Sequence, residues 1–257
     1  MTILMKVAYD GTEFCGYQIQ RSDRTVQGEL ESALEKLLRR PVRTVCAGRT
    51  DTGVHALGQY VSFSTDCPGI EPSSFAPALN SRLPKDVTVM ASRQVPDDFH
   101  AQYSARQRHY RYFLYAAPAI LPHRRRYAWR IPEFPSLERL NRDASALVGT
   151  HDFSTFAMLG GEQRSTVRTI SYARFEPDRD DGLEFRIGAT GFLRRMVRSI
   201  VGTLIERERL CLRGQEVPLS LEEILARGDR RGAGTTAPPW GLFLYDVEYE
   251  PPNQPDR

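Results

Sequence analysis

The chain has 257 residues, of which 40% are hydrophobic and 26% charged, as in globular proteins with a sizeable core. This length allows one large domain or two of ordinary size. No apolar run approaches the roughly 20 residues that a membrane helix needs, and no basic-then-apolar signal segment opens the chain. We therefore expect neither a membrane partner nor secretion.

The cysteines and the basic residues indicate a compartment and a class of partner. None of the four cysteines forms a Cys-x-x-Cys pair, so neither a metal site nor a redox dithiol is indicated, and free thiols suit the reducing cytoplasm. The net charge is +3, and 32 of the 35 basic residues are arginine, whose planar guanidinium binds phosphates and bases. A genome of biased composition would give the same excess, so composition alone does not establish a nucleic-acid partner.

The first half of the chain predicts four strands and two helices. The expected strands are 4–9, 43–47, 59–64 and 86–92, and the expected helices are 25–40 and 71–83. Thr25 can cap the first helix, whose apolar residues fall on one face. The pattern breaks around residues 96–104, so we assign residues 1–104 to an N-terminal domain.

The second half begins with an unusual strand over residues 106–115, in which basic and aromatic side chains interleave. Arg108, Tyr110 and Tyr112 would share one face of this strand. Such interleaving suits contact with nucleic-acid backbones and bases, and it equally suits an aromatic strand of an ordinary core.

The second domain, assigned to residues 105–250, continues with a proline-rich excursion over 118–135, whose run Arg124–Arg126 can touch phosphate. The expected helices are 136–147, 192–209 and 220–227, and the expected strands are 167–175, 183–188 and one that ends near residue 249. Residues 251–257 are expected to form a disordered tail. Because neither half alternates strictly as βαβ, the pattern favours an α+β fold with largely antiparallel sheets.

The least ordinary stretch of the chain is the glycine-rich loop within residues 46–59, which lies between two expected strands and carries Arg49, Asp51 and His55. Glycines let the backbone bend sharply, and a carboxylate at the tip of such a turn can be aimed outward. An aspartate in a turn can equally bond its own backbone and simply shape the turn.

The tripeptide Asp51-Thr52-Gly53 is also that of the aspartic proteases, whose chemistry needs two carboxylates that share a proton. The chain has no second Asp-Thr-Gly, and the polar residues Arg49 and Thr50 precede this one where those enzymes are apolar. Both features argue against a protease.

The whole loop resembles a known signature. Residues Ala47-Gly-Arg-Thr-Asp-Thr-Gly-Val-His-Ala56 are similar to the signature of the tRNA pseudouridine synthase A (TruA) family, and a match of this length in register is specific. Further matches to the family lie along nearly the whole chain: Tyr9-Asp-Gly11, Gly16-Tyr-Gln18, Thr25-Val-Gln27, Tyr110-Arg-Tyr112, His151-Asp-Phe153, Met196-Val-Arg198 and Gly241-Leu242.

The resemblance implies a fold and an activity. It implies two RRM/ferredoxin-like α+β halves that share a continuous, mainly antiparallel sheet with a central cleft, and a cytoplasmic homodimer. It also implies an isomerase that converts uridine to pseudouridine on the 3′ side of the tRNA anticodon arm. The reaction involves no redox change and no energy input, so no cofactor is expected, and no metal site is expected either.

The resemblance also assigns residues to the reaction. Asp51 would be the catalytic carboxylate, Arg198 its partner, and Arg49 an RNA contact that helps to extrude the base. Tyr110 aligns with the active-site tyrosine of the family, and Leu242 lies in a matching motif as a substrate contact. Whether Asp51 attacks C1′, attacks the ring or deprotonates the sugar stays open.

Two points qualify this interpretation. A non-catalytic module that binds or folds tRNA would explain the arginines and aromatics equally well, but it would not explain an intact Arg49–Asp51 loop together with Arg198. Gln102 stands where the family usually has an arginine, which would remove one contact to RNA or within the protein.

Overall fold

The computed structural model describes residues 1–67, 69–158, 165–178 and 182–250. It separates into two compact units: unit one holds residues 1–107 and 243–257, and unit two holds residues 108–242. The chain therefore enters unit two three residues later than the sequence pattern suggests and returns to unit one for its last strand. The expected tail, 251–257, lies outside the described residues.

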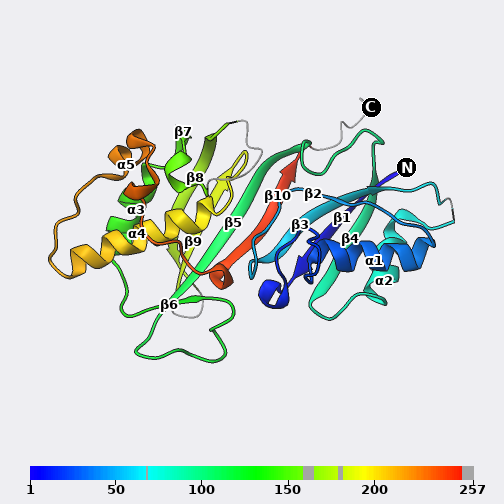
Figure 1. Cartoon of the computed structure of the whole chain (residues 1–257), viewed down its shortest axis with the longest axis horizontal. Helices are drawn as coiled ribbons and strands as arrows, with labels where there is room; N and C mark the ends of the chain where they lie inside the picture. Colours follow the sequence, from blue (N-terminus) through cyan, green and yellow to red (C-terminus); the bar gives the residue numbers. More distant parts are fainter. Residues whose placement is uncertain (68, 159–164, 179–181, 251–257) are drawn as a thin grey trace. The chain divides into compact units, whose positions relative to one another are not determined.

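Unit one has the element order of a ferredoxin-like fold, strand–helix–strand–strand–helix–strand. The elements are β1 (Thr2–Tyr9), α1 (Val26–Leu38), β2 (Val45–Cys46), β3 (His55–Ser64), α2 (Phe75–Asn80) and β4 (Val87–Val95). β1 lies between β4 and β3, antiparallel to both. β2 pairs antiparallel with the later part of β3, while β10 (Leu242–Tyr249) pairs parallel with its first residues. Figure 1 shows α1 and α2 lying against this sheet.

The first helix forms where the sequence predicts it. The Thr25 side chain accepts a hydrogen bond from the Gly28 backbone N–H at the N-terminus of α1, and the helix ends at Arg39, which adopts the left-handed conformation. On its apolar face, Val26, Leu30 and Leu34 are fully buried. Helix α2 is shorter than expected, because residues 72–74 form a separate 3₁₀ turn.

Unit two is likewise built of strands and helices, in a different order. Its elements are β5 (Ala105–Ala116, in this unit from residue 108), β6 (Trp129–Ile131), α3 (Leu137–Ser145), β7 (Gly149–Asp152), β8 (Val167–Pro177), β9 (Gly182–Ala189), α4 (Met196–Leu212) and α5 (Leu221–Arg227). The sheet runs β5-β9-β8-β7 with antiparallel neighbours, and β6 adds to β5 in parallel. Helix α3 packs on β8 and on α4.

Helix α4 carries the longest apolar stripe of the chain and buries all of it. The stripe comprises Met196, Val197, Ile200, Val201, Leu204 and Ile205, each buried. The helix begins four residues later than the pattern predicts because Arg195 has a positive φ of 62° and forms its N-cap. At Gly202 a Cβ would lie 1.7 Å from the Thr235 carbonyl oxygen, so only glycine allows this approach of helix and chain.

The predicted α+β class with mainly antiparallel sheets is confirmed. The sequence did not predict β6 and β7, since one has three residues in a proline-rich segment and the other, Gly-Thr-His-Asp, has no apolar alternation. Phe153 and Phe156, which follow His151, lie in the core. Among the described residues, no helix is both long and apolar enough to cross a bilayer.

Candidate functional site

The Asp51 loop, residues 47–54, connects β2 to β3 in unit one. Its tip is a tight turn in which the Val54 N–H donates to the Asp51 carbonyl at 3.1 Å and Gly53 has a φ of +75°. Asp51 is partly exposed, whereas Thr52 and Arg49 are exposed. The turn therefore presents the carboxylate at the surface of its unit on a backbone of fixed shape.

The N-terminal segment that contains the Gly16-Tyr-Gln18 motif supports this turn. The Tyr17 N–H donates to the Thr50 carbonyl at 3.1 Å, and the Gly53 N–H donates to the Phe14 carbonyl at 3.3 Å. Gly16 has a φ of +89°, and a Cβ there would lie 2.8 Å from the Thr50 oxygen. This motif has to contain glycine because it packs directly on the Asp51 loop.

Two buried polar side chains fix the base of the same loop. The Tyr9 hydroxyl lies 2.7 Å from the Thr50 hydroxyl, and the Gln59 amide donates to the Gly48 carbonyl at 2.6 Å. Burial raises the pKa of Tyr9, so its hydroxyl keeps its proton. The sequence predicts no role for the side chains of Tyr9, Thr50 or Gln59. Gln59 at an inward position of a predicted strand was the available signal, because a buried amide needs a partner.

His55 follows the loop but lies in the core. It is fully buried at the start of β3, its ring stacks on Phe243 with centroids 4.5 Å apart, and its Nδ1 accepts from the Gly11 N–H at 3.0 Å. His55 therefore serves the packing of unit one.

Tyr110 and Tyr112 lie on β5 in unit two, and both are buried. The Tyr110 ring meets Phe192 edge to face, with centroids 5.0 Å apart. The Tyr112 hydroxyl donates to the Pro238 carbonyl at 2.8 Å. Burial raises the pKa of Tyr112 well above its usual value, and the nearby charge of Arg198 opposes the rise. Tyr112 is thus a core residue of the interleaved strand.

Arg198 lies in the first turn of α4 and is hydrogen-bonded to the segment that precedes β10. Its Nε donates to the Ala237 carbonyl at 2.8 Å, and the Ala237 N–H donates back to the Arg198 carbonyl at 3.0 Å. The same segment leads through Pro238 to Leu242, which is buried as the first residue of β10. Arg198, Tyr112 and Leu242 are therefore all connected to residues 237–242.

The structure divides the predicted site residues between the two units. Unit one carries Arg49 and Asp51 on one loop, and unit two carries Tyr110, Arg198 and Leu242. In unit one, buried polar side chains support the loop that carries Arg49 and Asp51.

The basic run of the excursion is split in the structure. The Arg124 guanidinium lies 3.4 Å from an Asp178 carboxylate oxygen and 4.9 Å from the centre of the Tyr115 ring. Arg125 and Arg126 are exposed. Arg124 thus holds the excursion onto unit two.

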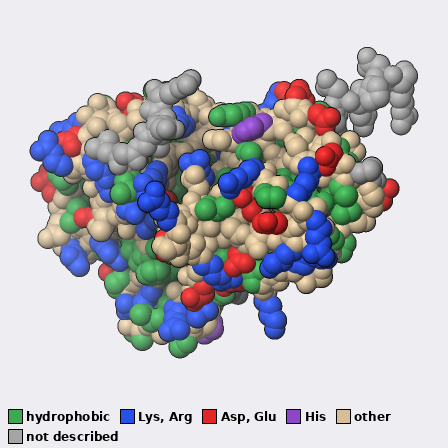
Figure 2. Space-filling model, turned by 45° about the vertical axis from the view of Figure 1, so that its right-hand side comes forward, with side chains coloured by type: hydrophobic (Ala, Val, Ile, Leu, Met, Phe, Trp, Pro, Cys, Tyr) green, Lys and Arg blue, Asp and Glu red, His purple; other side chains and the backbone are tan. Residues whose placement is uncertain are grey.

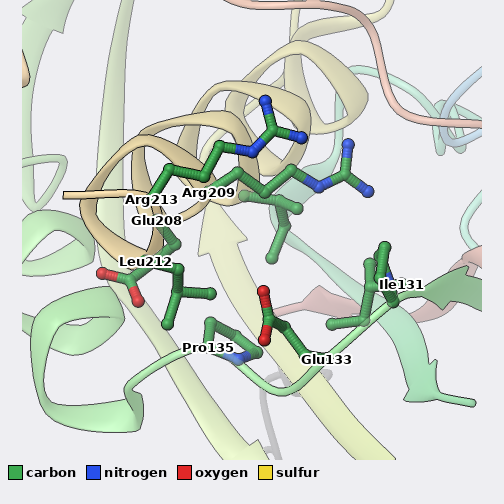
Figure 3. Close-up of a pocket in the computed structure, with 9 residues that line it drawn as sticks. Ile131, Glu133, Pro135, Glu208, Arg209, Leu212 and Arg213 are labelled. Carbon is green, nitrogen blue, oxygen red and sulfur yellow. The ribbon is translucent and has the colours of Figure 1, made fainter. Parts of the chain in front are cut away.

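A hollow of about 230 Å³ in unit two contains none of the predicted site residues. Figure 3 shows Arg209 and Arg213 extending side by side from α4, with Leu212 on the same helix and Glu133 on the segment after β6. In Figure 2, basic side chains occur at many places across the face in view, with acidic side chains among them. Charge therefore singles out no one region of this face.

Comparison with known proteins identifies the family. The family model described as tRNA pseudouridine synthase matches residues 5–104 and 144–250. A tRNA pseudouridine synthase A of Treponema denticola is 43% identical over 252 residues, which cover 96% of this chain and 92% of that protein. The protein of the same name from Exiguobacterium sp. is 41% identical over 248 residues, covering 96% of this chain and 98% of its own.

Among solved structures, one chain of a Cbf5-Nop10-Gar1 complex aligns with 77% of this chain and 43% of its own, at 9% identity and a TM-score of 0.35. That similarity is too weak to support a functional inference. The sequence relatives align over almost their whole length, and the family model covers most of the described residues. The chain belongs to the tRNA pseudouridine synthase A family and is an isomerase.

Proposed function

We propose that this protein converts uridine to pseudouridine in the anticodon arm of tRNA, with Asp51 as the catalytic carboxylate. The observation that supports this assignment most strongly is the Asp51 loop, where a partly exposed carboxylate sits on a turn fixed by Tyr9, Gly16 and Gln59. A turn-shaping aspartate needs no such support from two other segments of the chain. Membership of an isomerase family leaves nothing that favours a non-catalytic tRNA-binding module.

The reaction is an isomerisation. The bond from N1 to C1′ breaks, the uracil turns, and a bond from C5 to C1′ forms, while the hydrogen on C5 leaves and N1 takes up a proton. Nothing is oxidised or reduced, so the chemistry requires no cofactor. An ionised Asp51 can attack C1′, attack the ring or remove a proton from the sugar, and each role begins with a carboxylate close to the nucleoside.

The other four residues would place the nucleotide. Arg49, exposed beside Asp51, would contact the RNA backbone while the target base leaves its stack. Tyr110 would offer its ring to the extruded uracil and its hydroxyl to the C5 proton. Arg198 would pair with the Asp51 carboxylate, its Nε already fixed on Ala237. Leu242 would pack against the base.

A tritium-release assay tests this function directly. Because the C5 hydrogen is lost, an anticodon-arm RNA labelled with tritium at C5 of uridine should release label to water with the wild-type protein. An otherwise identical RNA with cytidine in place of the 3′-side uridines should release none. An RNA copied from another arm of the tRNA provides the second control. Absence of release from the first RNA, or equal release from all uridine-containing RNAs, would contradict the proposal.

We further propose, on the family resemblance, that the protein acts as a homodimer in the cytoplasm. Light scattering on the purified protein should give twice the mass of 29.2 kDa. A mass equal to that of one chain at micromolar concentration would contradict the dimer.

A further inference from the structure

A second hollow lies in unit one, beside the Asp51 loop. It has a volume of about 200 Å³ and is bounded by the Gly16-Tyr-Gln18 motif, the start of α1, β2, the Asp51 loop and the segment after β4. Tyr17, Arg49, His100 and Gln102 are among the residues that line it. At about 30 Å³ per water molecule this is the space of six or seven waters, which is enough for one planar base.

A buried hydroxyl without a partner belongs to this pocket. Tyr17 is 2% exposed, and its hydroxyl makes no hydrogen bond in the structure. Burial raises the pKa of Tyr17 well above its usual value, and the Thr44 side chain opposes the rise in part, so the hydroxyl keeps its proton and can donate. Buried polar groups in folded proteins are almost always hydrogen-bonded. Tyr17 is therefore a donor buried in the wall of this pocket, beside the Thr44 side chain.

His100 supplies a second oriented donor. Its Nδ1 accepts from the backbone N–H groups of Gln102 and Tyr103, each at 3.3 Å. The neutral ring therefore carries its proton on Nε2. The ring also stacks on Tyr103, with centroids 4.2 Å apart, and the Tyr103 side chain is 79% exposed. These contacts hold the imidazole in place and provide an exposed aromatic ring next to the pocket.

The chemistry of the lining selects an acceptor-rich ligand. Tyr17 and His100 donate, Arg49 carries a positive charge, and none of the residues lining the pocket is acidic. Carbonyl oxygens of a pyrimidine or of guanine meet these donors, whereas a metal cation or an amine would find no compensating charge. Aromatic rings beside a basic residue are the usual platform for single-stranded bases.

We propose that this pocket receives the base of a nucleotide adjacent to the target uridine in the same RNA strand. The inference rests on the proposed function, because Arg49 belongs both to this pocket and to the loop that presents Asp51. A base held in the pocket fixes the strand on one side of the target and so places the extruded uridine relative to the carboxylate.

Binding of a set of RNAs to matched variants tests the proposal. The set contains the intact anticodon arm and arms that carry an abasic site at one nucleotide on either side of the target. The variants are Tyr17→Phe and Gln102→Ala, and Gln94→Ala is the control, because Gln94 is another exposed glutamine of unit one and does not line the pocket. Affinities are measured by fluorescence anisotropy, and melting temperatures are recorded for every protein.

The wild type should lose affinity about tenfold for one abasic RNA only. Tyr17→Phe and Gln102→Ala should bind the intact RNA about three to ten times more weakly than the wild type does. The abasic site should lower the affinity of these two variants only slightly further. Gln94→Ala should behave as the wild type. Tyr17→Phe should melt no lower than the wild type, because the lost hydroxyl has no protein partner. A purely structural Tyr17 would lower the melting temperature instead.

Two results would overturn the pocket inference. In the first, the abasic site lowers the RNA affinity of the variants by the same factor as that of the wild type, so the two losses are additive. The other is saturable binding of free uridine or cytidine monophosphate that Tyr17→Phe abolishes while its RNA affinity is unchanged. Tritium release by the wild type on the intact arm is measured first. Its absence contradicts the proposed function, whereas release together with either result contradicts the pocket alone.

Discussion

Hydrogen bonds hold both the Asp51 loop of unit one and the segment 235–242 of unit two, and close packing on a helix also holds the segment. The loop is fixed by hydrogen bonds, chiefly those of Thr50 with Tyr9 and Tyr17 and that of Gly48 with Gln59. The segment has hydrogen bonds too, those of Ala237 with Arg198 and of Thr235 with Glu206, and it also packs closely on α4, where Gly202 admits the Thr235 carbonyl. The segment therefore depends on available volume as well as on polar atoms, so a substitution that adds volume should affect it more than the loop.

The difference follows from what each region has to present. A surface turn has few apolar atoms to bury, so apolar burial cannot fix the position of a carboxylate on it. Hydrogen bonds from buried hydroxyl and amide groups fix the turn instead. The position of Arg198, in the first turn of α4, is set by the packing of that helix. Substitutions that remove a hydrogen bond of the loop should therefore lower turnover without unfolding the protein. Substitutions that disturb the packing of the segment should lower the stability of the protein.

The largest effect is expected from Asp51→Asn. The amide keeps the size of the side chain and removes its charge, so turnover in the tritium assay should fall by about a thousandfold or more, whereas tRNA affinity should stay within a few-fold. Asp98→Asn, at an exposed aspartate of the same unit, is the matched control. Appreciable turnover by Asp51→Asn would remove the catalytic assignment.

Gly202→Ala should cause the largest loss of stability. The new methyl would lie 1.7 Å from the Thr235 oxygen, so α4 and the segment must separate, at a cost of about 3 kcal/mol in the free energy of unfolding. The hydrogen bonds between Arg198 and Ala237 should weaken with it. Gly232→Ala is the control, because its Cβ would meet only ordinary contacts at 3.8 Å. Denaturant unfolding of both variants measures the difference, and equal midpoints would show that the segment is loosely packed.

The sequence predicted the packed region better than the hydrogen-bonded one. The apolar stripe of α4 and the Thr25 cap of α1 follow from periodicity and local propensity, and both were found at nearly the predicted positions. The support of Asp51 by Tyr9 and Gln59 joins residues 41 and 11 positions away from the loop residues they bond, and no local pattern encodes such pairs. The pairing of β10 with β3 in unit one also joins distant parts of the chain, so no local pattern predicts it.

Tyr110→Phe should have an intermediate effect. The ring keeps its edge-to-face contact with Phe192, so tRNA affinity and melting temperature should not change, while single-turnover product formation should fall about 10-fold to 100-fold if the hydroxyl moves the C5 proton. Tyr110→Leu should lose base placement as well as turnover. Turnover by Tyr110→Phe equal to that of the wild type would show that the hydroxyl has no chemical role. Unfolding of both variants would show that Tyr110 is a core residue.

Tyr9→Phe separates support of the loop from general stability. Losing the 2.7 Å hydrogen bond to Thr50 should cost about 1 kcal/mol of unfolding free energy and lower turnover at saturating RNA several-fold. Tyr249→Phe is the matched control in the same unit, because its hydroxyl donates to the Ala101 carbonyl at 2.7 Å, away from the loop. It should cost similar stability and leave turnover unchanged. Equal turnover in the two variants would mean that the hydrogen bonds under the loop do not position Asp51.

The smallest effect concerns phosphate contacts of the basic excursion in unit two. Arg125→Ala and Arg126→Ala should each lower the slope of log K against log salt for tRNA binding by roughly 0.7 to 0.9, because each exposed guanidinium neutralises one phosphate. Arg124→Ala should leave the slope unchanged and lower the melting temperature, because Arg124 pairs with Asp178 and covers the Tyr115 ring. The three neighbouring arginines are thus matched controls for one another. Equal slopes for all three variants and the wild type would show that the excursion stays clear of the RNA and that its exposed charges are only solvated.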